Sequence, residues 1–521
     1  MGVRWLWIDS LCIIQDDKDD WEAQAAAMAG IYENSSFTIA AHSKQDRLLP
    51  APREWRRTFA VEEGGHSAEV HVRHVPSLSL HSGQIAAPLM AGKSIQDEPH
   101  LWNEVSLRGW CVQERMLSSV VLHFTDQEVL YEKYGRILDC HCGFHIHYMF
   151  RPPWEDINAD HVARWAVPKP YGCGVFFEGD LPSVSWKLIV EHYSLCVFTR
   201  ADDILPAIAG VARRLFEKTC GTEDAYVAGL LDRPHVPGES ILSWLCWSSS
   251  SWPSQLYDST CELCRVWPER CGLPLRASNA TVSPALFRVL FRRPRVSHVV
   301  PSFSWASRMG PCEWPGVECF SPTWIPSSRI LRRVYSASQA NPFARFLSVE
   351  LTLEGPLYRG LLFSSSGKSE RMHGGCRAVC GYFLPAGGQS LPALRAKLPD
   401  PDQQGTPLEE PFCTVQKAGI HYILDAQDDV PSDGAEGVLL EIGRSPEDTV
   451  ILLVLVPCRG SGGSNTGLCS TEEVPRYCRI GFLRVYMAEG KIACSASRFR
   501  QNRCDAVDAL RGAGHTKLCL V

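Results

Sequence analysis

The fold of the first part of the chain is set by residues 3–42, VRWLWIDSLCIIQDDKDDWEAQAAAMAGIYENSSFTIAAH. This stretch opens with an apolar run, continues with a helical repeat and ends with a second apolar run. Four side chains share the i, i+4, i+7, i+11 spacing of one helix face: Trp21, Ala25, Met28 and Tyr32. Strand, helix and strand within about 40 residues are typical of a βαβ unit. The stretch therefore predicts an α/β module with a parallel sheet.

The ends of these elements carry polar residues with predictable roles. Residues 3–9 read as a buried strand that ends at Asp9, and 37–42 as a second strand. Asp19 or Asp20 is placed to cap the intervening helix by accepting from its first N–H groups. Ligands of open α/β sheets bind outside the carboxyl ends of strands, so Asp9 is a candidate ligand-binding residue. The alternative is that Asp9 braces the loop after it.

Composition bounds the class of protein. A chain of 521 residues is expected to hold two or more domains. Hydrophobic content of 45% and charged content of 21% are ordinary for a globular protein. The net charge of -6 argues against nucleic acid as a partner, and no apolar run reaches the ~20 residues of a membrane span. The 22 cysteines are scattered and no signal peptide is recognisable, which predicts a cytoplasmic protein with reduced thiols.

Four regions succeed one another along the chain. Residues 1–150 form the α/β module, with further strands expected at 119–124 and 128–134. A helical accessory region comes next, then a stretch rich in Ser, Pro, Cys and Arg that reads as an insertion or mobile loop, and last a β-rich C-terminal region. These three regions cover residues 151–247, 248–299 and 300–521.

The later regions have their own patterned elements. Residues 184–198 are predicted to form a helix that enters a loop, and residues 202–219 a helix with its apolar side chains on one face. Asp202 and Asp203 are placed to cap that second helix. Residues 450–456, VILLVLV, read as a buried strand of the C-terminal region.

Several blocks of the chain resemble one family. Residues 6–41 and the block RGWCVQERMLSSVVLHFTDQEVLYE (108–132) resemble the fungal heterokaryon incompatibility (HET) domain. Four later blocks are similar to segments that lie after this domain in large fungal proteins: 186–212, 224–231, 300–307 and 476–485. The resemblance implies non-self recognition that triggers regulated cell death, through protein partners or self-association and without a cofactor. Family members carry a strand and a helix ahead of the 6–41 block, so we expect this chain to lack them.

The resemblance also implies a fold similar to Toll/interleukin-1 receptor (TIR) domains, a flavodoxin-like α/β module. Some TIR domains cleave NAD with a Glu that comes after a Trp-Cys pair, and WCVQE here places Glu114 after Trp110. A carboxylate can stabilise the oxocarbenium-like transition state of such cleavage. Arg108 could then orient a phosphate, while Trp110 stacks on a base or packs in the core. The alternative is that Glu114 pairs with Arg108 or Arg115 and only orders a helix start.

Three hypotheses for function stay open at this point: signalling by protein contacts, cleavage of NAD as a substrate by Glu114, and an inactive truncated paralogue. Zinc ligand types gather at Cys140, Cys142, His145 and His147, but their spacing fits no common finger and we predict no metal site. The basic run FRVLFRRPR (287–295) reads as a solvated loop.

Overall fold

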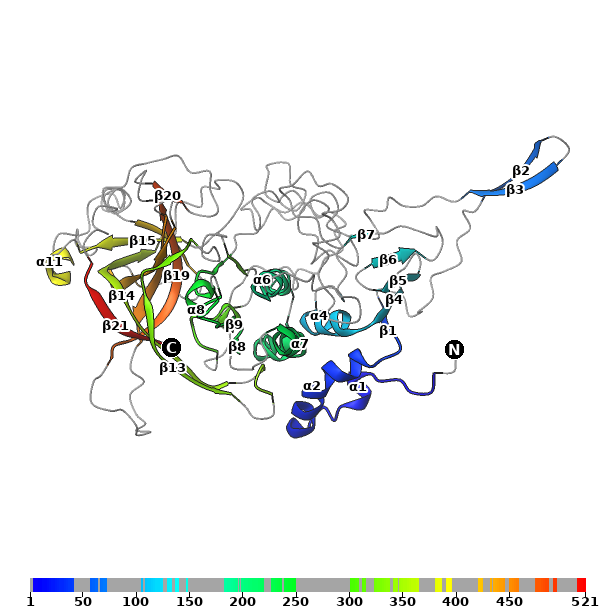
Figure 1. The fold of residues 1–521 in the computed structure, drawn as a ribbon, viewed down its shortest axis with the longest axis horizontal. Helices are drawn as coiled ribbons and strands as arrows, with labels where there is room; N and C mark the ends of the chain where they lie inside the picture. The colour runs from blue at the N-terminus through cyan, green and yellow to red at the C-terminus, as the bar shows by residue number, and fades with distance from the viewer. Residues whose placement is uncertain are drawn as a thin grey trace, which may run out of the picture. The chain divides into compact units, whose positions relative to one another are not determined.

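The computed structural model of the chain describes a defined set of residues. These are 3–41, 57–63, 66–72, 105, 108–124, 129–133, 136–139, 147–148, 182–194, 196, 198–219, 226–236, 239–249, 300–308, 312–314, 323–337, 341–344, 346–364, 380–386, 390–395, 420–424, 432, 434–445, 449–458, 474–486, 491–493 and 513–521. The chain divides into two compact units (Figure 1), Met1–Asp180 with Cys261–Val282 and Leu181–Thr260 with Ser283–Val521. Apart from Ser248 and Ser249, the predicted insertion at 248–299 lies outside the described residues, as does the basic run. The four predicted region boundaries stay predictions.

The first unit holds a mixed sheet with strand order β1-β4-β5-β6-β7, in which β1 and β4 pair in parallel and the other pairs are antiparallel. Its elements are α1 (Asp9–Cys12), α2 (Lys18–Glu33), β1 (Thr38–Ala41), the separate hairpin β2 (Arg57–Glu63) and β3 (His66–Val72), α4 (Gly109–Leu117), β4 (Val120–Phe124), β5 (Val129–Lys133), β6 (Arg136–Asp139) and β7 (His147–Tyr148). Mixed α and β content is thus confirmed, whereas parallel pairing within this unit is limited to one pair of its described strands. The TIR-like fold stays a prediction.

The predicted first strand is the main error in this unit. Residues 3–8 pair with no described strand, and Trp5 is 89% exposed. Asp9 is the first residue of the short helix α1 and does not end a strand. An apolar run becomes a strand only where a neighbour takes up its backbone hydrogen bonds, and a short run without alternation cannot reveal whether that neighbour exists. The predicted strand over 37–42, by contrast, is confirmed as β1.

The predicted helix is confirmed as α2, but its cap lies two or three residues earlier than expected. Asp17 is the N-cap, and its Oδ1 accepts from the N–H groups of Asp19 and Asp20 at 2.9 and 3.1 Å. Asp19 and Asp20 lie inside the first turn, where their negative charge is favourable near the positive end of the helix dipole. The side chain of Asp20 also accepts from the N–H of Ile14 at 2.8 Å, which ties the preceding loop to the helix.

The second unit begins with the helical region. Its elements are α6 (Pro182–Tyr193), the 3-10 turns η2 (Ala201–Asp203) and η3 (Pro206–Ile208), α7 (Ala209–Thr219), the hairpin β8 (Tyr226–Val227) and β9 (Leu230–Leu231), α8 (Ile241–Trp244), β10 (Ser248–Ser249), η6 (Trp305–Ser307) and β11 (Cys312–Glu313). The helix predicted at 202–219 is regular only from Ala209, because Pro206 has no N–H to donate. The turn η2 begins after Arg200, whose side chain makes no capping hydrogen bond, and Asp202 and Asp203 lie in its first turn, so their capping role stays a prediction. The predicted apolar face is confirmed as buried: Leu205, Ile208, Ala209, Ala212, Leu215 and Phe216.

A tight turn ties the tryptophans of this region together. Gly229, between β8 and β9, has a φ of +92° that favours glycine. Its carbonyl accepts from the indole N–H groups of Trp186 and Trp305, each at 2.9 Å. A Cβ at this position would lie 2.7 Å from Nε1 of Trp305, so the close approach also requires glycine.

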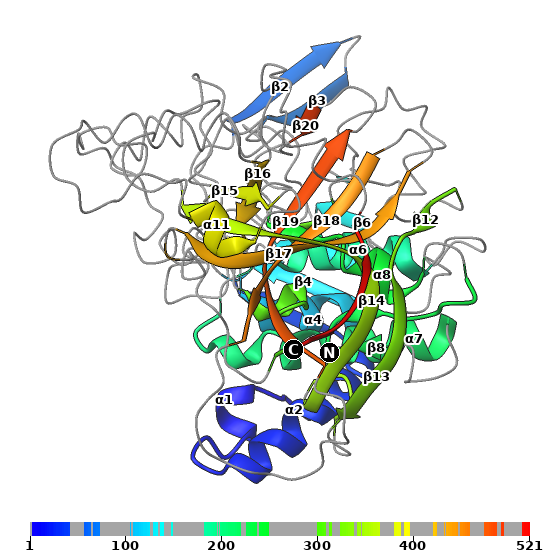
Figure 2. The same cartoon turned by 90° about the vertical axis from the view of Figure 1, so that its left-hand side faces the viewer.

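The β-rich C-terminal region is confirmed as a ten-stranded sheet. Its strands are β12 (Ile325–Pro326), β13 (Arg329–Ala337), β14 (Phe346–Ser364), β15 (Cys380–Pro385), β16 (Ile420–Leu424), β17 (Ala435–Arg444), β18 (Thr449–Pro457), β19 (Arg476–Tyr486), β20 (Lys491–Ala493) and β21 (His515–Leu520). The long strand β14 pairs with both β15 and β17. As a result β14, β17, β18, β19, β16 and β15 close on themselves as an antiparallel ring of strands, strongly curved in Figures 1 and 2.

All six strands of the ring contribute to one apolar core: Tyr358, Leu362, Phe383, Tyr422, Leu439, Val450, Leu452, Val454, Ile480, Leu483 and Val485. The short helix α11 (Leu391–Arg395) adds Leu394 to a second cluster with Leu361 and Ala386. A ring leaves its member strands without open edges, which protects them from pairing with other chains. In the described part of the chain, no helix is both long enough and apolar enough to cross a membrane.

Candidate functional site

The block at 108–118 folds as the helix α4, which begins after the extended residue Arg108. Its buried residues fall on one face of the helix: Gly109, Gln113, Met116 and Leu117. Ser118 ends the helix, because its hydroxyl donates to the carbonyl of Glu114 at 2.6 Å. The same hydroxyl lies 2.5 Å from that of Thr38 in β1. The helix is therefore fixed to the sheet at its C-terminal end, which holds Glu114 in place.

The structure brings Glu114 together with two of the other predicted site residues. The half-buried carboxyl of Glu114 accepts hydrogen bonds from the hydroxyl of Tyr32 and the thiol of Cys111. Burial raises the pKa of Glu114, and the negative charge of Asp9 raises it further. The positive charge of Arg108 and the two hydrogen bonds lower it, but they do not offset the first two effects. Glu114 is therefore harder to ionise than an ordinary glutamate.

Tyr32 also belongs to this site, although the sequence analysis placed it only on one face of the predicted helix. It lies in the last turn of α2, and its ring meets the ring of Trp7 edge-on, with centroids 5.6 Å apart. Burial raises the pKa of Tyr32 far above its ordinary value, as do the charges of Glu114 and Asp9. The phenol consequently stays protonated and serves Glu114 as a hydrogen-bond donor.

Asp9 reaches the site from α1 and not from the end of a strand. It is exposed, and its Oδ1 accepts from the N–H of Ser10 at 2.7 Å. Its carbonyl accepts from the side chain of Gln15 at 3.1 Å and from the N–H of Ile13 at 3.1 Å. Asp9 thus braces the following loop, as the alternative predicted, and also places a second carboxylate near Glu114. Binding of a ligand by Asp9 stays a prediction.

The other two predicted residues differ in what they contact. The ring of Trp110 packs edge-on against Trp21 of α2, with centroids 6.0 Å apart and planes at 89°. Trp110 therefore packs within the protein, which was one of the two predicted roles. Stacking of Trp110 on a base stays a prediction. Arg108 is exposed at the start of α4, where a guanidinium can meet a phosphate group.

A second carboxylate lies on the sheet side of α4 and was missed by the sequence analysis. Arg115 donates to Glu132 of β5 at 2.9 Å, and His123 of β4 lies 2.7 Å from the same oxygen. The side chain of Glu132 is fully buried. Successive helix residues point roughly 100° apart, so this network anchors Arg115 to the sheet while Glu114 faces α1 and α2. Only strand pairing brings these residues together, and no sequence signal marks them.

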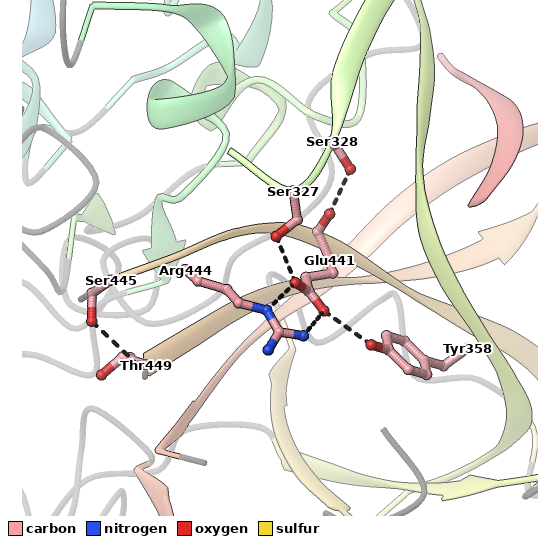
Figure 3. Close-up of polar contacts among 7 residues, drawn as sticks. All are labelled: Ser327, Ser328, Tyr358, Glu441, Arg444, Ser445 and Thr449. Atoms are coloured by element: carbon pink, nitrogen blue, oxygen red, sulfur yellow. Dashed lines mark hydrogen bonds and ion pairs between the residues drawn. The ribbon is translucent and has the colours of Figure 1, made fainter. Parts of the chain in front are cut away.

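The second unit contains a contrasting glutamate, Glu441 of β17, which Figure 3 shows. Its carboxylate accepts from Arg444 at 2.6 and 3.0 Å, from the hydroxyl of Ser327 at 2.5 Å and from that of Tyr358 at 2.9 Å. Burial alone would raise its pKa, but the hydrogen bonds and charge of Arg444, with the hydroxyl of Ser327, hold the pKa below its ordinary value. The backbone carbonyl of Glu441 also accepts from Ser328 at 2.5 Å. These contacts make Glu441 an anchor of the sheet.

Among the residues that the structure describes, no three His, Cys, Asp or Glu side chains are grouped so that they could hold a metal ion. Cys140, Cys142 and His145 of the predicted cluster lie outside the described residues, and His147 is described only as backbone of β7.

Comparison with known families gives one match. The family described as heterokaryon incompatibility protein (HET) matches residues 1–114, a range that includes α1, α2 and Glu114 of α4. No curated protein and no solved structure matches the chain. Residues 1–114 of this chain thus match the model of the heterokaryon incompatibility (HET) family, which confirms the resemblance found in the sequence.

Proposed function

We propose that this chain acts in fungal non-self recognition and triggers regulated cell death through its HET region. The family match over residues 1–114 supports a heterokaryon-incompatibility-type function. The observation that carries the signalling mode is a run of exposed large apolar side chains: Val3, Trp5, Leu6, Ile8, Leu11 and Ile14. Exposed apolar side chains concentrated in one segment are typical of surfaces that bind protein partners. The partner is another protein or a second copy of the chain.

Expression in fungal cells tests this mode, with the fraction of surviving cells as the readout. We expect the triple variant Trp5→Ser, Leu6→Ser and Leu11→Ser to lose its toxicity. Leu347→Ser is the matched control, because Leu347 is an equally exposed apolar residue in the sheet of the other unit. Unchanged toxicity of the triple variant, at equal protein level, would overturn signalling through this segment. The cytoplasmic location predicted from the sequence stays a prediction.

A second function, cleavage of NAD by a TIR-like site, is favoured by one specific observation. Glu114 has Asp9 and Arg108 within electrostatic range and a hydrogen bond from Tyr32. A half-buried carboxyl with a perturbed pKa and an exposed cation nearby is a common arrangement in active sites. NAD in this proposal is a substrate and not a bound cofactor.

The proposed chemistry balances without any other reactant than water. Nicotinamide leaves with the bonding electron pair as a neutral molecule, and the ribose carbon becomes oxocarbenium-like. The ionised carboxylate of Glu114 stabilises that positive charge. Arg108 pairs with the diphosphate and Trp110 lies beside the base. Water then attacks the ribose carbon and releases its proton to Glu114 or to solvent.

Release of nicotinamide from NAD by the full chain tests this second function. We expect release by the wild type and by Glu441→Gln, and its loss in Glu114→Gln. The absence of release, together with toxicity that survives Glu114→Gln, would eliminate the enzyme and leave signalling by contacts. The absence of both release and toxicity would favour the third hypothesis, an inactive chain.

A further inference from the structure

Two cysteines lie side by side where two central strands of the large sheet meet. Cys458 directly follows β18, and Cys478 is the third residue of β19. Their sulfur atoms are 2.9 Å apart. A disulfide bond has an S–S distance of about 2.05 Å, so a movement of less than about 1 Å would join them.

The strand register explains why these two side chains meet. Cys478 lies opposite Val456 in the antiparallel pair of β18 and β19, and Tyr477 lies opposite Pro457. The N–H of Cys458 donates to the carbonyl of Arg476 at 3.0 Å, which continues the same register by one residue. Cys458 and Cys478 are therefore diagonal neighbours on one face of the sheet, a relation in which side chains are within reach of one another. The contact is fixed by backbone pairing.

These two thiols differ in exposure from four other cysteines of the second unit. Both are half-buried, whereas Cys196, Cys246, Cys312 and Cys519 are buried. Burial raises the pKa of the Cys196 thiol to about 12 and, with the charge of Glu350, that of Cys519 to about 11. Because the thiolate is the reactive species, buried thiols of this kind react slowly. A small oxidant can reach the pair at 458 and 478 more easily.

We propose that Cys458 and Cys478 form a reversible disulfide when the chain meets a small disulfide oxidant such as oxidised glutathione. The thiolate of one cysteine attacks a sulfur of the oxidant, which gives a mixed disulfide and releases one glutathione thiol. The second thiolate attacks the protein sulfur of that mixed disulfide and releases the second glutathione. The protein thiols are oxidised, the glutathione disulfide is reduced, and the two thiol protons end on the two released glutathione molecules.

The bond would fasten two strands that carry the core of the ring. β18 and β19 contribute Leu452, Val454 and Ile480 to that core. The cysteines are 20 residues apart along the chain, and a cross-link that closes a loop of this size restricts the unfolded chain. Oxidation would therefore make the sheet of the second unit harder to unfold, and reduction would reverse the effect.

The full chain can be tested by incubation with oxidised glutathione, alkylation of the remaining thiols, tryptic digestion and mass spectrometry. Cleavage at arginine places Cys458 in the peptide 445–459 and Cys478 in the peptide 477–479. We expect these two peptides to appear joined, two hydrogen masses lighter than their sum, and to separate after reduction. Both cysteines alkylated as fully as without oxidant, or either one joined to a different cysteine, would overturn the proposal.

Variants give a second readout. Cys458→Ser and Cys478→Ser should each lose the joined peptides, whereas Cys519→Ser, on the neighbouring strand β21, should keep them. Oxidised wild type should unfold at a temperature several degrees higher than reduced wild type. An increase of the same size in Cys458→Ser would show that another cysteine is responsible and would contradict the assignment.

Discussion

Glu114 in the first unit is half-buried and Glu441 in the second is buried, and each accepts a hydrogen bond from a tyrosine hydroxyl. Burial pushes the pKa of both upward. Arg444 gives Glu441 two hydrogen bonds, and the pKa of Glu441 lies below the ordinary value for a glutamate. Glu114 has Asp9 as a neighbour, and the pKa of Glu114 lies above that ordinary value.

The opposite pKa shifts show that the charged form of one glutamate stabilises the fold and that of the other does not. The contacts of Glu441 compensate the loss of water, so ionisation of this group stabilises the sheet. Ionisation of Glu114 costs folding free energy, because burial removes the carboxylate from water, a second carboxylate lies nearby and the cation does not compensate. Carboxyls held in unfavourable surroundings are concentrated at functional sites. The comparison therefore supports the proposal that Glu114 is functional, whereas the contacts of Glu441 are those of a structural residue.

The strongest effect should be on chemistry. Glu114→Gln keeps the shape of the side chain but removes the charge, and we expect NAD cleavage to fall by about 100- to 1,000-fold. Nicotinamide release at saturating NAD measures it. Glu441→Gln is the control and should retain most of the wild-type rate. A loss of equal size in both variants would point to unfolding and remove the contrast between the two glutamates.

A smaller effect is expected on stability. Glu441→Ala removes the acceptor for Ser327, Tyr358 and Arg444, and leaves the tyrosine hydroxyl in a buried position. We expect the free energy of unfolding to fall by roughly 2–4 kcal/mol. The fall should lie at the lower end of this range, because Arg444 is 41% exposed and its side chain can turn to water. Hydrogen exchange of the β17 and β18 amides measures the loss. A change below ~1 kcal/mol would mean that Glu441 is no anchor.

The tyrosines offer a matched pair with a more modest effect. Tyr32→Phe removes a hydrogen bond that lowers the pKa of Glu114, so that pKa should rise further. The rate of NAD cleavage should increase as pH rises through this pKa, since the ionised form acts. We expect the acid limb of the pH–rate profile to shift to higher pH in Tyr32→Phe. Tyr358→Phe should leave it in place, and an identical shift in both would contradict the assignment.

The sequence predicted individual helices and strands better than it predicted which of them pair or pack together. The α2 pattern and the apolar run of β18 are periodic or long enough to indicate helix and strand, and both are confirmed. Residues 3–9 failed as a strand because an apolar run does not show which neighbour would pair with it. The ring closes through pairing of β14 with β17, whose residues are far apart in sequence, and no local pattern specifies that register.

The same limit applies to the candidate site. Glu114 and Arg108 were chosen from motif position and Asp9 from a predicted strand end, and the structure brings the three near one another. The donor role of Tyr32 and the network of Arg115, His123 and Glu132 depend on packing between elements. Residues of these types occur throughout the sequence, so only the contacts single them out.

The contrast between the two glutamates is tested most directly by the free energy of unfolding of Glu114→Gln and Glu441→Gln, measured as a function of pH. The expected differences are the smallest of those predicted here. At pH near 7.5 we expect Glu114→Gln to equal or exceed wild type by up to ~1 kcal/mol, an advantage that disappears as pH falls toward the ordinary glutamate pKa. Glu441→Gln should be less stable by about 1–2 kcal/mol, with the penalty lost as pH falls through the lowered pKa of Glu441. Opposite signs at neutral pH would support the division into functional and structural glutamates. Destabilisation of both variants by similar amounts at neutral pH would contradict it.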